Sequence, residues 1–210
     1  MNRTQKIVFT LAAILMVGVG ACLWLLLSSR SPAQTPAMTE AGVLLMKEPR
    51  GVPAVSMSDQ DGSQVRLDKL TGHWTLVFFG YTFCPDICPT TLAQLRQIDS
   101  RLPAASRARL KVVFVSVDPQ RDSPGQLKQY LGYFDPAFTG LVGTPESLEQ
   151  LANGLSIPYI APDTRQPNYS VQHSGNMALL GPDGTQRGLI RAPFNTEKVL
   201  AVLPGLLSGN

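Results

Sequence analysis

The sequence is poor in cysteine, in histidine and in net charge. Its 210 residues include 3 Cys and 2 His, and 18 basic residues stand against 15 acidic ones, for a formal net charge of +3. Residues 1–30 hold three basic residues and no acidic one, so the rest of the chain carries 15 of each. Without a basic surplus there is no reason to expect a nucleic-acid-binding face. The sequence also has no internal repeat and no low-complexity tract, which leaves a globular domain as its main feature.

An uncharged apolar run occupies residues 7–27, with the sequence IVFTLAAILMVGVGACLWLLL. As a helix that rises about 1.5 Å per residue, it would cover the roughly 30 Å of bilayer hydrocarbon. The run therefore predicts a single transmembrane helix. Two alternatives fit it less well. A cleaved signal peptide has an apolar region of only about 7 to 15 residues, and a lipoprotein processed at Cys22 would begin inside the run, at CLWLLL.

The charges that flank this run predict its orientation. Arg3, Lys6 and the amino terminus precede it, whereas only Arg30 follows closely, and positive charge favours the cytoplasmic side. We therefore expect residues 1–6 in the cytoplasm and the rest of the chain outside it. Nothing near the N-terminus resembles an Arg- and Ser-rich transit peptide. This predicts a bacterial inner-membrane protein with a periplasmic domain, where cysteines meet oxidants.

Beyond the apolar run, the composition predicts a linker followed by one domain. Residues 28–42 are small, polar and proline-bearing, which is typical of a tether. The folded domain is then predicted over residues 43–210. Its length is within the usual range for a single globular domain with a substantial core.

Within the domain, strand patterns alternate with helix patterns. Continuous apolar runs predict buried strands, and apolar residues at near-helical spacing behind Ser-Pro and Thr-Pro predict helices. A late antiparallel pair flanks the turn GPDG. Together these elements predict an α/β sandwich with a mixed sheet and a thioredoxin-like architecture. The predicted elements are a hairpin within 53–67, strands at 74–81, 111–118, 177–180 and 186–191, and helices beginning near 89, 124, 145 and 194.

The stretch YTFCPDICPT, residues 81–90, places two cysteines directly after a predicted buried strand. Prolines after Cys84 and Cys88 disfavour the helical region at both positions, so the two thiols should lie in a strand-to-helix loop. Pro89 suits the first helical position, which makes Cys88 the expected N-cap, with a thiolate favoured by the helix dipole. This end of an α/β sheet is where ligands commonly bind.

Three uses of the cysteine pair remain open from the residues alone. A structural disulfide would close a loop too short to restrict the unfolded chain much. A thiol redox couple usually has the spacing C-x-x-C, and the additional residue here weakens that match without excluding it. Two thiolates also suit the soft ion Cu(I), for which an imidazole would be a third ligand.

The two histidines differ in their distance from the cysteine pair. His73 precedes the strand whose far end leads to the cysteines, roughly 25 Å away at about 3.3 Å per residue, so it cannot be a ligand with them. His173, in YSVQHSG, precedes the strand at 177–180. If that strand runs antiparallel to the central one, its start lies beside the cysteines. His173 is then the predicted third ligand.

Three segments, in order, carry a resemblance to a known family: FGYTFCPDICPTTL, VSVDPQRDSP, and YSVQHS followed by LLGPDG. They are similar to the successive signatures of the SCO/SenC family, named for synthesis of cytochrome c oxidase, and the similarity covers roughly residues 50–208. The resemblance implies a thioredoxin-like fold behind one N-terminal membrane helix. It also implies that copper, as Cu(I) or Cu(II), is bound by Cys84, Cys88 and His173.

The resemblance further implies a task and partners. The protein would deliver copper to the binuclear copper site of cytochrome c oxidase subunit II, or reduce the cysteines of that site, and a donor protein would supply the copper. One departure from the family pattern is Gln172, where many relatives have an aspartate before the histidine. Loss of that charge could alter the orientation or basicity of the imidazole.

Two enzyme classes are alternatives to the metallochaperone. A membrane-tethered thiol-disulfide reductase would use Cys84 and Cys88 as its exchanging pair and would need no histidine. A peroxiredoxin-like peroxidase would want Ser or Thr three residues before its reactive cysteine, where this chain has Tyr81. The charged residues of VDPQRDSP are expected to organise a loop and helix start near the site; they are Asp118, Arg121 and Asp122.

Overall fold

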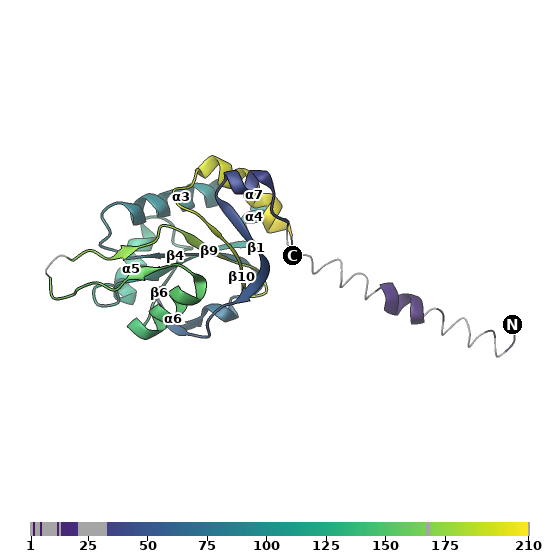
Figure 1. The fold of residues 1–210 in the computed structure, drawn as a ribbon, viewed down its shortest axis with the longest axis horizontal. Helices are drawn as coiled ribbons and strands as arrows, with labels where there is room; N and C mark the ends of the chain where they lie inside the picture. The colour runs from purple at the N-terminus through teal and green to yellow at the C-terminus, as the bar shows by residue number, and fades with distance from the viewer. Residues whose placement is uncertain are drawn as a thin grey trace. The chain divides into compact units, whose positions relative to one another are not determined.

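A computed structural model describes residues 2, 5, 12, 14–20, 33–166 and 169–209. Residues 33–208 form one compact unit, and residues 1–32 with 209–210 are assigned to another (Figure 1). No helix among the described residues is long and apolar enough to cross a membrane. The transmembrane helix predicted at 7–27 lies largely outside the described residues.

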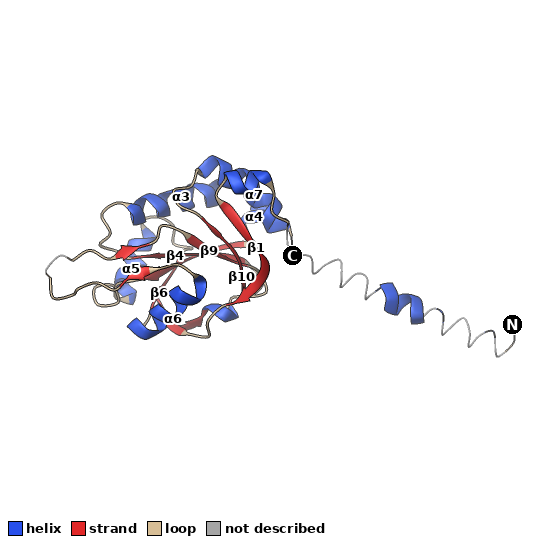
Figure 2. Cartoon of the chain, in the orientation of Figure 1, coloured by secondary structure: helices blue, strands red, loops and turns tan. Residues whose placement is uncertain are grey.

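A mixed sheet of eight strands forms the centre of the unit at residues 33–208 (Figures 1 and 2). In spatial order the strands are β1 (Val43–Gly51), β10 (Thr185–Ile190), β9 (Met177–Leu180), β4 (Trp74–Gly80), β5 (Leu110–Ser116), β6 (Thr139–Val142), β2 (Ser56–Asp59) and β3 (Gln64–Arg66). The neighbours β4, β5 and β6 run parallel, and the other pairs are antiparallel. The predicted mixed sheet is therefore confirmed.

The central strand β4 is buried along its whole length. Leu76 and Phe78 belong to one core cluster, and Val77 and Phe79 belong to the other. Successive residues of a strand face opposite sides of the sheet. A continuous apolar run therefore indicates a strand that is covered on both faces, as the sequence of β4 predicts.

Helices cover both faces of the sheet (Figure 2). The core cluster that contains Phe78 includes side chains from α3 (Ile87–Arg101), α5 (Pro124–Gly132) and α7 (Thr196–Ser208), and the opposite cluster includes side chains from α6 (Pro145–Leu155). A short further helix, α4 (Ala104–Arg107), follows α3. This three-layer arrangement is the predicted α/β sandwich.

Two helix starts follow the predicted capping chemistry. The side chain of Ser123 accepts a hydrogen bond from the backbone N–H of Gln126 at the start of α5. Thr144 accepts one from Ser147 at the start of α6. In both helices a proline occupies the first helical position, where its missing N–H has no intrahelical partner to lose. Both starts fix the loops that precede them.

The folded unit begins earlier than predicted. Residues 28–42 were expected to be a linker, but Pro36–Glu40 form the helix α2, whose N-cap is Thr35. Within it, Met38 is only 6% exposed and belongs to the main core cluster. The segment resembles a tether in composition because, of residues 33–42, only Met38 and Ala41 are buried. The boundary near Val43 is therefore corrected to about residue 33.

The register between β4 and β9 decides where the predicted histidine lies. Phe78 pairs with Met177 and Thr75 pairs with Leu180, so the two strands are antiparallel. The start of β9 therefore lies beside the end of β4 that leads to the cysteines. His73 precedes the opposite end of β4 and is exposed. The condition on which the prediction for the other histidine depended is confirmed.

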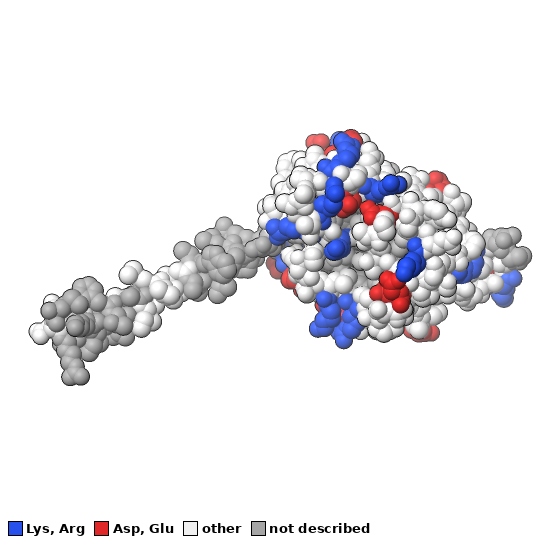
Figure 3. Space-filling view, turned by 180° about the vertical axis from the view of Figure 1, so that it is seen from behind, with Lys and Arg blue, Asp and Glu red and all other residues white. Residues whose placement is uncertain are grey.

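Charged side chains of both signs occur on the face seen in Figure 3, with Lys and Arg among Asp and Glu. Several of the described ones form ion pairs, including Arg101 with Glu197 and Arg187 with Asp183. Exposed pairs of this kind contribute only about 0 to 1 kcal/mol each to stability. The buried core, rather than surface charge, therefore holds the fold.

Candidate metal centre

Cys84 lies in a short loop between β4 and α3 that a buried carboxylate holds in place. The Asp122 side chain accepts hydrogen bonds from the backbone N–H of Thr82 at 3.1 Å, from the Thr82 hydroxyl at 2.6 Å and from the Ser116 hydroxyl at 2.7 Å. The backbone N–H of Cys84 donates to the carbonyl of Tyr81 at 3.2 Å and closes a turn. Asp122 thus organises this loop, as its motif predicts.

Cys88 lies in the first turn of α3 and not at its N-cap. The helix begins at Ile87, and Asp86 occupies the N-cap position without a side-chain capping hydrogen bond. The predicted N-cap is therefore wrong by two residues. Pro89 is tolerated inside the first turn because the first four N–H groups of a helix have no intrahelical partner. One of these groups, the N–H of Cys88, donates to the sulfur of Cys84 at 3.4 Å.

His173 reaches the site from a small two-stranded sheet beside the main one. The strand β8 (Gln172–His173) pairs with β7 (Tyr159–Ile160), so that Tyr159 lies opposite His173. The Nδ1 atom of His173 lies 3.2 Å from the carbonyl oxygen of Ser174. Because a carbonyl can only accept, this contact places the proton of the neutral ring on Nδ1 and leaves the Nε2 lone pair toward the sulfurs. That is the form in which imidazole binds metals.

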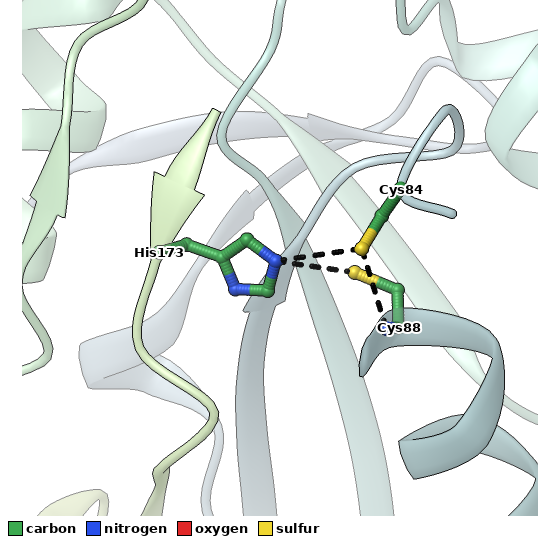
Figure 4. Close-up of side chains that lie close together, drawn as sticks. All are labelled: Cys84, Cys88 and His173. Atoms are coloured by element: carbon green, nitrogen blue, oxygen red, sulfur yellow. Dashed lines mark hydrogen bonds between the residues drawn. The ribbon is translucent and has the colours of Figure 1, made fainter. Parts of the chain in front are cut away.

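The three side chains converge on one point (Figure 4). The Nε2 atom of His173 lies 3.5 Å from the Sγ atom of Cys88 and 3.8 Å from the Sγ atom of Cys84, and all three ligand atoms lie within 4.8 Å of one another. Metal–sulfur and metal–nitrogen bonds of about 2.3 and 2.0 Å would place sulfur and nitrogen about 3.7 Å apart in a trigonal arrangement. The site therefore fits one metal ion with little movement of the side chains.

Aromatic rings and one glycine shape the inner wall of the site. The rings of Phe78 and Tyr81 contact the His173 imidazole edge to face, with centroids 6.1 and 5.8 Å away. A Cβ atom at Gly80 would lie 2.6 Å from the sulfur of Cys88, so only glycine fits there without displacing the thiol. Sequence reasoning missed this role of Gly80. The available signal was a glycine at the end of a buried strand, directly before the cysteine motif.

The two thiols have opposite electrostatic environments. A hydrogen bond from the Cys88 thiol, with smaller help from backbone N–H groups, lowers the pKa of Cys84 to about 3 against the opposing effect of burial. The same contact with Cys84, together with burial, raises the pKa of Cys88. In the reduced, metal-free protein Cys84 is thus the thiolate and Cys88 the neutral thiol. The expected assignment is reversed chiefly because Cys88, the more buried thiol, keeps its proton and donates it to the sulfur of Cys84; the N–H of Cys88 in the first turn of α3 adds a smaller contribution.

We expect alkylation of Cys84 by iodoacetamide to be nearly independent of pH between about 5 and about 8. With a pKa of about 3, this thiol is fully ionised throughout that range. A cysteine with the ordinary pKa of about 8.5 would instead gain roughly tenfold in thiolate per pH unit. The rate is measured by mass on the peptide that contains Cys84, in the reduced, metal-free full-length protein. The unfolded protein is the control and should show the steep rise; a steep rise in the folded protein would contradict the assignment.

The structure brings together three of the residues singled out from the sequence, Cys84, Cys88 and His173, and keeps His73 at the far end of the sheet. The third cysteine, Cys22, lies outside the described residues. Besides Gly80, a second residue near the site was not predicted. Tyr169 stacks on Arg121, with the guanidinium carbon 3.7 Å from the ring centroid. Its only signal in the sequence was its place in YSVQHS, four residues before the histidine.

Comparison with known proteins gives a family match over most of the chain. The family model described as SCO1/SenC matches residues 47–208. A protein of Stutzerimonas stutzeri, whose provisional name is copper-binding protein, is 41% identical over 198 residues, which make up 94% of this chain and 96% of that protein. The similarity therefore extends well beyond the segments around the cysteines and the histidine.

Solved structures of similar proteins share the fold. The solution structure of apo Sco1 from Thermus thermophilus has a TM-score of 0.69 and 34% identity, over 77% of this chain and 94% of that one. The structure of Bradyrhizobium japonicum ScoI with copper bound has a TM-score of 0.64 and 30% identity, over 74% of this chain and 98% of that one. The thioredoxin-like fold predicted from the sequence is confirmed.

Proposed function

The chain belongs to the SCO1/SenC family, and from that premise we propose that it is a membrane-anchored copper metallochaperone for cytochrome c oxidase. Its cargo is copper, and its target is the binuclear copper site of subunit II, to which it delivers the metal, whose cysteines it reduces, or both. The observation that carries this proposal is the convergence of Cys84, Cys88 and His173 on one point.

The chemistry of the donor atoms favours copper over other metals. Two thiolates and one imidazole form a soft set of ligands that suits Cu(I). The imidazole also allows the site to bind Cu(II). Structural zinc sites normally have four protein ligands, whereas calcium and magnesium need oxygen ligands. Among the described residues, no other group of three Cys, His, Asp or Glu side chains is placed to hold a metal ion. The site is therefore best matched to one copper ion.

Release of the metal requires that a partner can reach it. Cys88 is fully buried, whereas Cys84 and His173 are partly exposed, so the site opens on one side. Two large apolar side chains beside the cysteines, Phe83 and Ile87, are 54% and 47% exposed. Three protein ligands leave room for an incoming thiolate, so copper can pass to a partner by exchange of one ligand at a time. These features support a cargo site rather than a permanent one.

The proposed location rests on the sequence outside the folded unit. Residues 7–27 are long and apolar enough to anchor the chain as one transmembrane helix. The excess of positive charge before this segment supports an N-terminus in the cytoplasm and a domain in the periplasm of a bacterial cell. A copper donor protein would then load the domain on the periplasmic side.

A second candidate function is thiol-disulfide exchange without a metal, which the opposite ionisation of the two thiols favours. The Cys84 thiolate attacks one sulfur of a target disulfide and forms a mixed disulfide with it. The other target sulfur leaves as a thiolate. The thiol of Cys88 then loses its proton and attacks the Cys84 sulfur, which releases the second target thiolate. Two electrons pass to the target, and Cys84 and Cys88 end as a disulfide that a reduced dithiol protein must reopen.

Copper delivery and reduction of the target are compatible on one site. Copper cannot bind a target whose cysteines are oxidised, so reduction would have to precede delivery. The reduced form of Cys84 and Cys88 could perform either step, but not both at once on one molecule. The two functions are separated by His173, which copper needs and disulfide exchange does not.

We expect the copper-loaded chain to transfer its metal to the reduced, metal-free copper domain of subunit II. The full-length chain carrying one Cu(I) is mixed with this domain under anaerobic conditions, the two are separated, and the copper in each is measured. Copper should move to the domain, because its site offers cysteine ligands that can replace those of the chaperone one at a time.

Free Cu(I) held by a small thiol at the same concentration is the control for transfer through solution. Transfer from the chain should be faster than from this control, because direct exchange avoids release of the ion. Copper that stays on the chain while the control fills the domain would contradict a delivery function.

A further inference from the structure

His173 lies at the end of a long connection whose first part, 161–166, is mainly exposed. The connection runs from β7 to β8, and its described residues are 161–166 and 169–171. A cavity of about 150 Å³ lies beneath its first part, with Pro162 and Thr164 on one side and Gln120 and Leu148 on the other. Among residues 161–166, Pro162 is half-buried and the others are exposed. Packing in this region therefore does little to fix the connection.

Two residues hold the second part of the connection: Val171 is buried in the core cluster that contains Val77, and Tyr169 makes polar and ring contacts. The Tyr169 ring lies over the guanidinium of Arg121, with the Cζ atom 3.7 Å from the ring centroid, and its hydroxyl donates a hydrogen bond of 2.7 Å to Oδ1 of Asp118. The other carboxylate oxygen of Asp118 pairs with Nε of Arg121. The Asp118 side chain is fully buried, and that of Arg121 is 21% exposed. We call these two contacts of Tyr169 the Tyr169 clamp.

Arg121 connects the Tyr169 clamp to the metal site, because it also contacts residues beside the site. The Cζ atom of this arginine also lies 5.1 Å from the ring centroid of Phe83, which precedes Cys84, and 5.6 Å from that of Tyr81. The ring of Tyr81 in turn packs edge to face on the His173 imidazole. Arg121 therefore touches both the loop that carries a cysteine and the connection that carries the histidine.

We propose that Tyr169, stacked on Arg121 and hydrogen-bonded to Asp118, is a positioning residue that holds His173 at the sulfur pair. The clamp fixes the connection four residues before the imidazole, at the place where the connection passes from its exposed part, 161–166, into the core at Val171. The two thiols have supports of their own, because Cys88 belongs to α3 and Asp122 holds the loop that carries Cys84. Loss of the clamp therefore leaves the two thiols in place and loosens the third ligand.

This inference deepens the proposed function, on which its copper readouts depend. Cu(I) is held well by two thiolates, whereas Cu(II) needs the imidazole. Loosening a group that orients a ligand typically lowers metal affinity by about 10- to 100-fold. Tyr169→Leu should therefore lower Cu(II) affinity by that factor and weaken the thiolate-to-Cu(II) absorption band, while Cu(I) affinity changes little. Tyr169→Phe keeps the ring over Arg121 and loses only the hydroxyl, so its effect should be smaller.

The first test needs no copper, because the chain has only two histidines. Imidazole signals of His73 and His173 are recorded by nuclear magnetic resonance in the reduced, metal-free full-length chain in detergent. In Tyr169→Leu the His173 signals should shift and broaden, while those of His73, at the far end of the sheet, stay unchanged. The control is Tyr133→Leu, since Tyr133 is 71% exposed and lies away from the connection. Unchanged His173 signals in Tyr169→Leu would overturn the proposal.

The second test asks whether the effect on copper passes through the histidine. Cu(II) affinity is measured for Tyr169→Leu, His173→Ala and the double variant. If Tyr169 acts by placing His173, the substitution should cost nothing further once the imidazole is absent. An equal loss in both backgrounds would mean that Tyr169 acts elsewhere, and the positioning role would be rejected.

The outcomes separate this proposal from the proposed function. A wild-type chain that binds no copper would refute the metallochaperone function. The imidazole signals would still show whether Tyr169 positions His173. Altered imidazole signals with unchanged Cu(II) affinity would refute the clamp as a determinant of copper binding. If Tyr169→Leu fails to fold, Tyr169→Phe and Arg121→Lys carry the same measurements, because each removes only one part of the clamp.

Discussion

Replacing His173 by alanine is expected to lower Cu(II) affinity by more than about 100-fold and to leave disulfide reduction close to the wild-type rate. The imidazole is one of three ligand atoms, and even the loss of a group that merely orients a ligand costs about 10- to 100-fold. The change leaves in place the main contact of the Cys84 thiolate, the hydrogen bond from the Cys88 thiol, and also the contact from the N–H of Cys88. Copper affinity and reduction of a test disulfide are measured on the same preparation.

Two matched variants serve as controls for this result. His73→Ala changes the other histidine, which is exposed at the opposite end of the sheet, and should leave both properties unchanged. Cys84→Ala removes both a ligand and the reactive thiolate, and should abolish both. If His173→Ala left copper binding and oxidase maturation intact while Cys84→Ala abolished maturation, the protein would be a membrane-tethered thiol reductase and not a metallochaperone.

The position of the site could be predicted because strand order follows from simple patterns. Apolar runs identify β4 and β9, and the turn GPDG indicates that β9 and β10 form an antiparallel pair. Once β9 lies antiparallel to β4, residues before one strand meet residues after the other. Cys84 and His173 are then brought together although they are 89 positions apart in the sequence.

The distribution of charge within the site could not be predicted from the sequence. Proline placement suggested a helix start at Pro89, but the helix begins at Ile87, and the N–H of Cys88 donates to the sulfur of Cys84. A shift of two residues is within the usual uncertainty of a helix boundary. The burial of Cys88, which favours its neutral form, has no signal in the sequence. The ionisation of two neighbouring thiols depends on contacts of a few ångströms, which a pattern of residue types does not specify.

The parts that support the site were also hidden, each for a physical reason. β7 and β8 have two residues each, too few to produce a periodic pattern. A side chain at Gly80 would collide with the sulfur of Cys88. Tyr169 stacks on Arg121, which lies 48 positions earlier in the chain. Such contacts join segments that are distant in sequence. They become visible only when the sheet has brought those segments together.

The oxidised protein is expected to bind no copper at this site. A disulfide between Cys84 and Cys88 removes both thiolates, and a single imidazole cannot hold the ion against competing ligands in solution. The two sulfur atoms lie within 4.8 Å of each other, so the bond can form with a small movement of the side chains. Reduction should restore full binding. If so, redox state would switch the protein between a copper-binding and a copper-free form.

The most direct test of the central claim is the copper content of one preparation in its reduced and oxidised forms, measured by native mass spectrometry. The full-length chain with Cys22→Ser is used, so that only Cys84 and Cys88 can form a disulfide. We expect one copper ion per reduced chain, no copper after oxidation, and one again after reduction, with zinc failing to displace it. Full copper binding by the oxidised chain, no copper on the reduced chain, or a preference for zinc would contradict a copper site built from Cys84, Cys88 and His173.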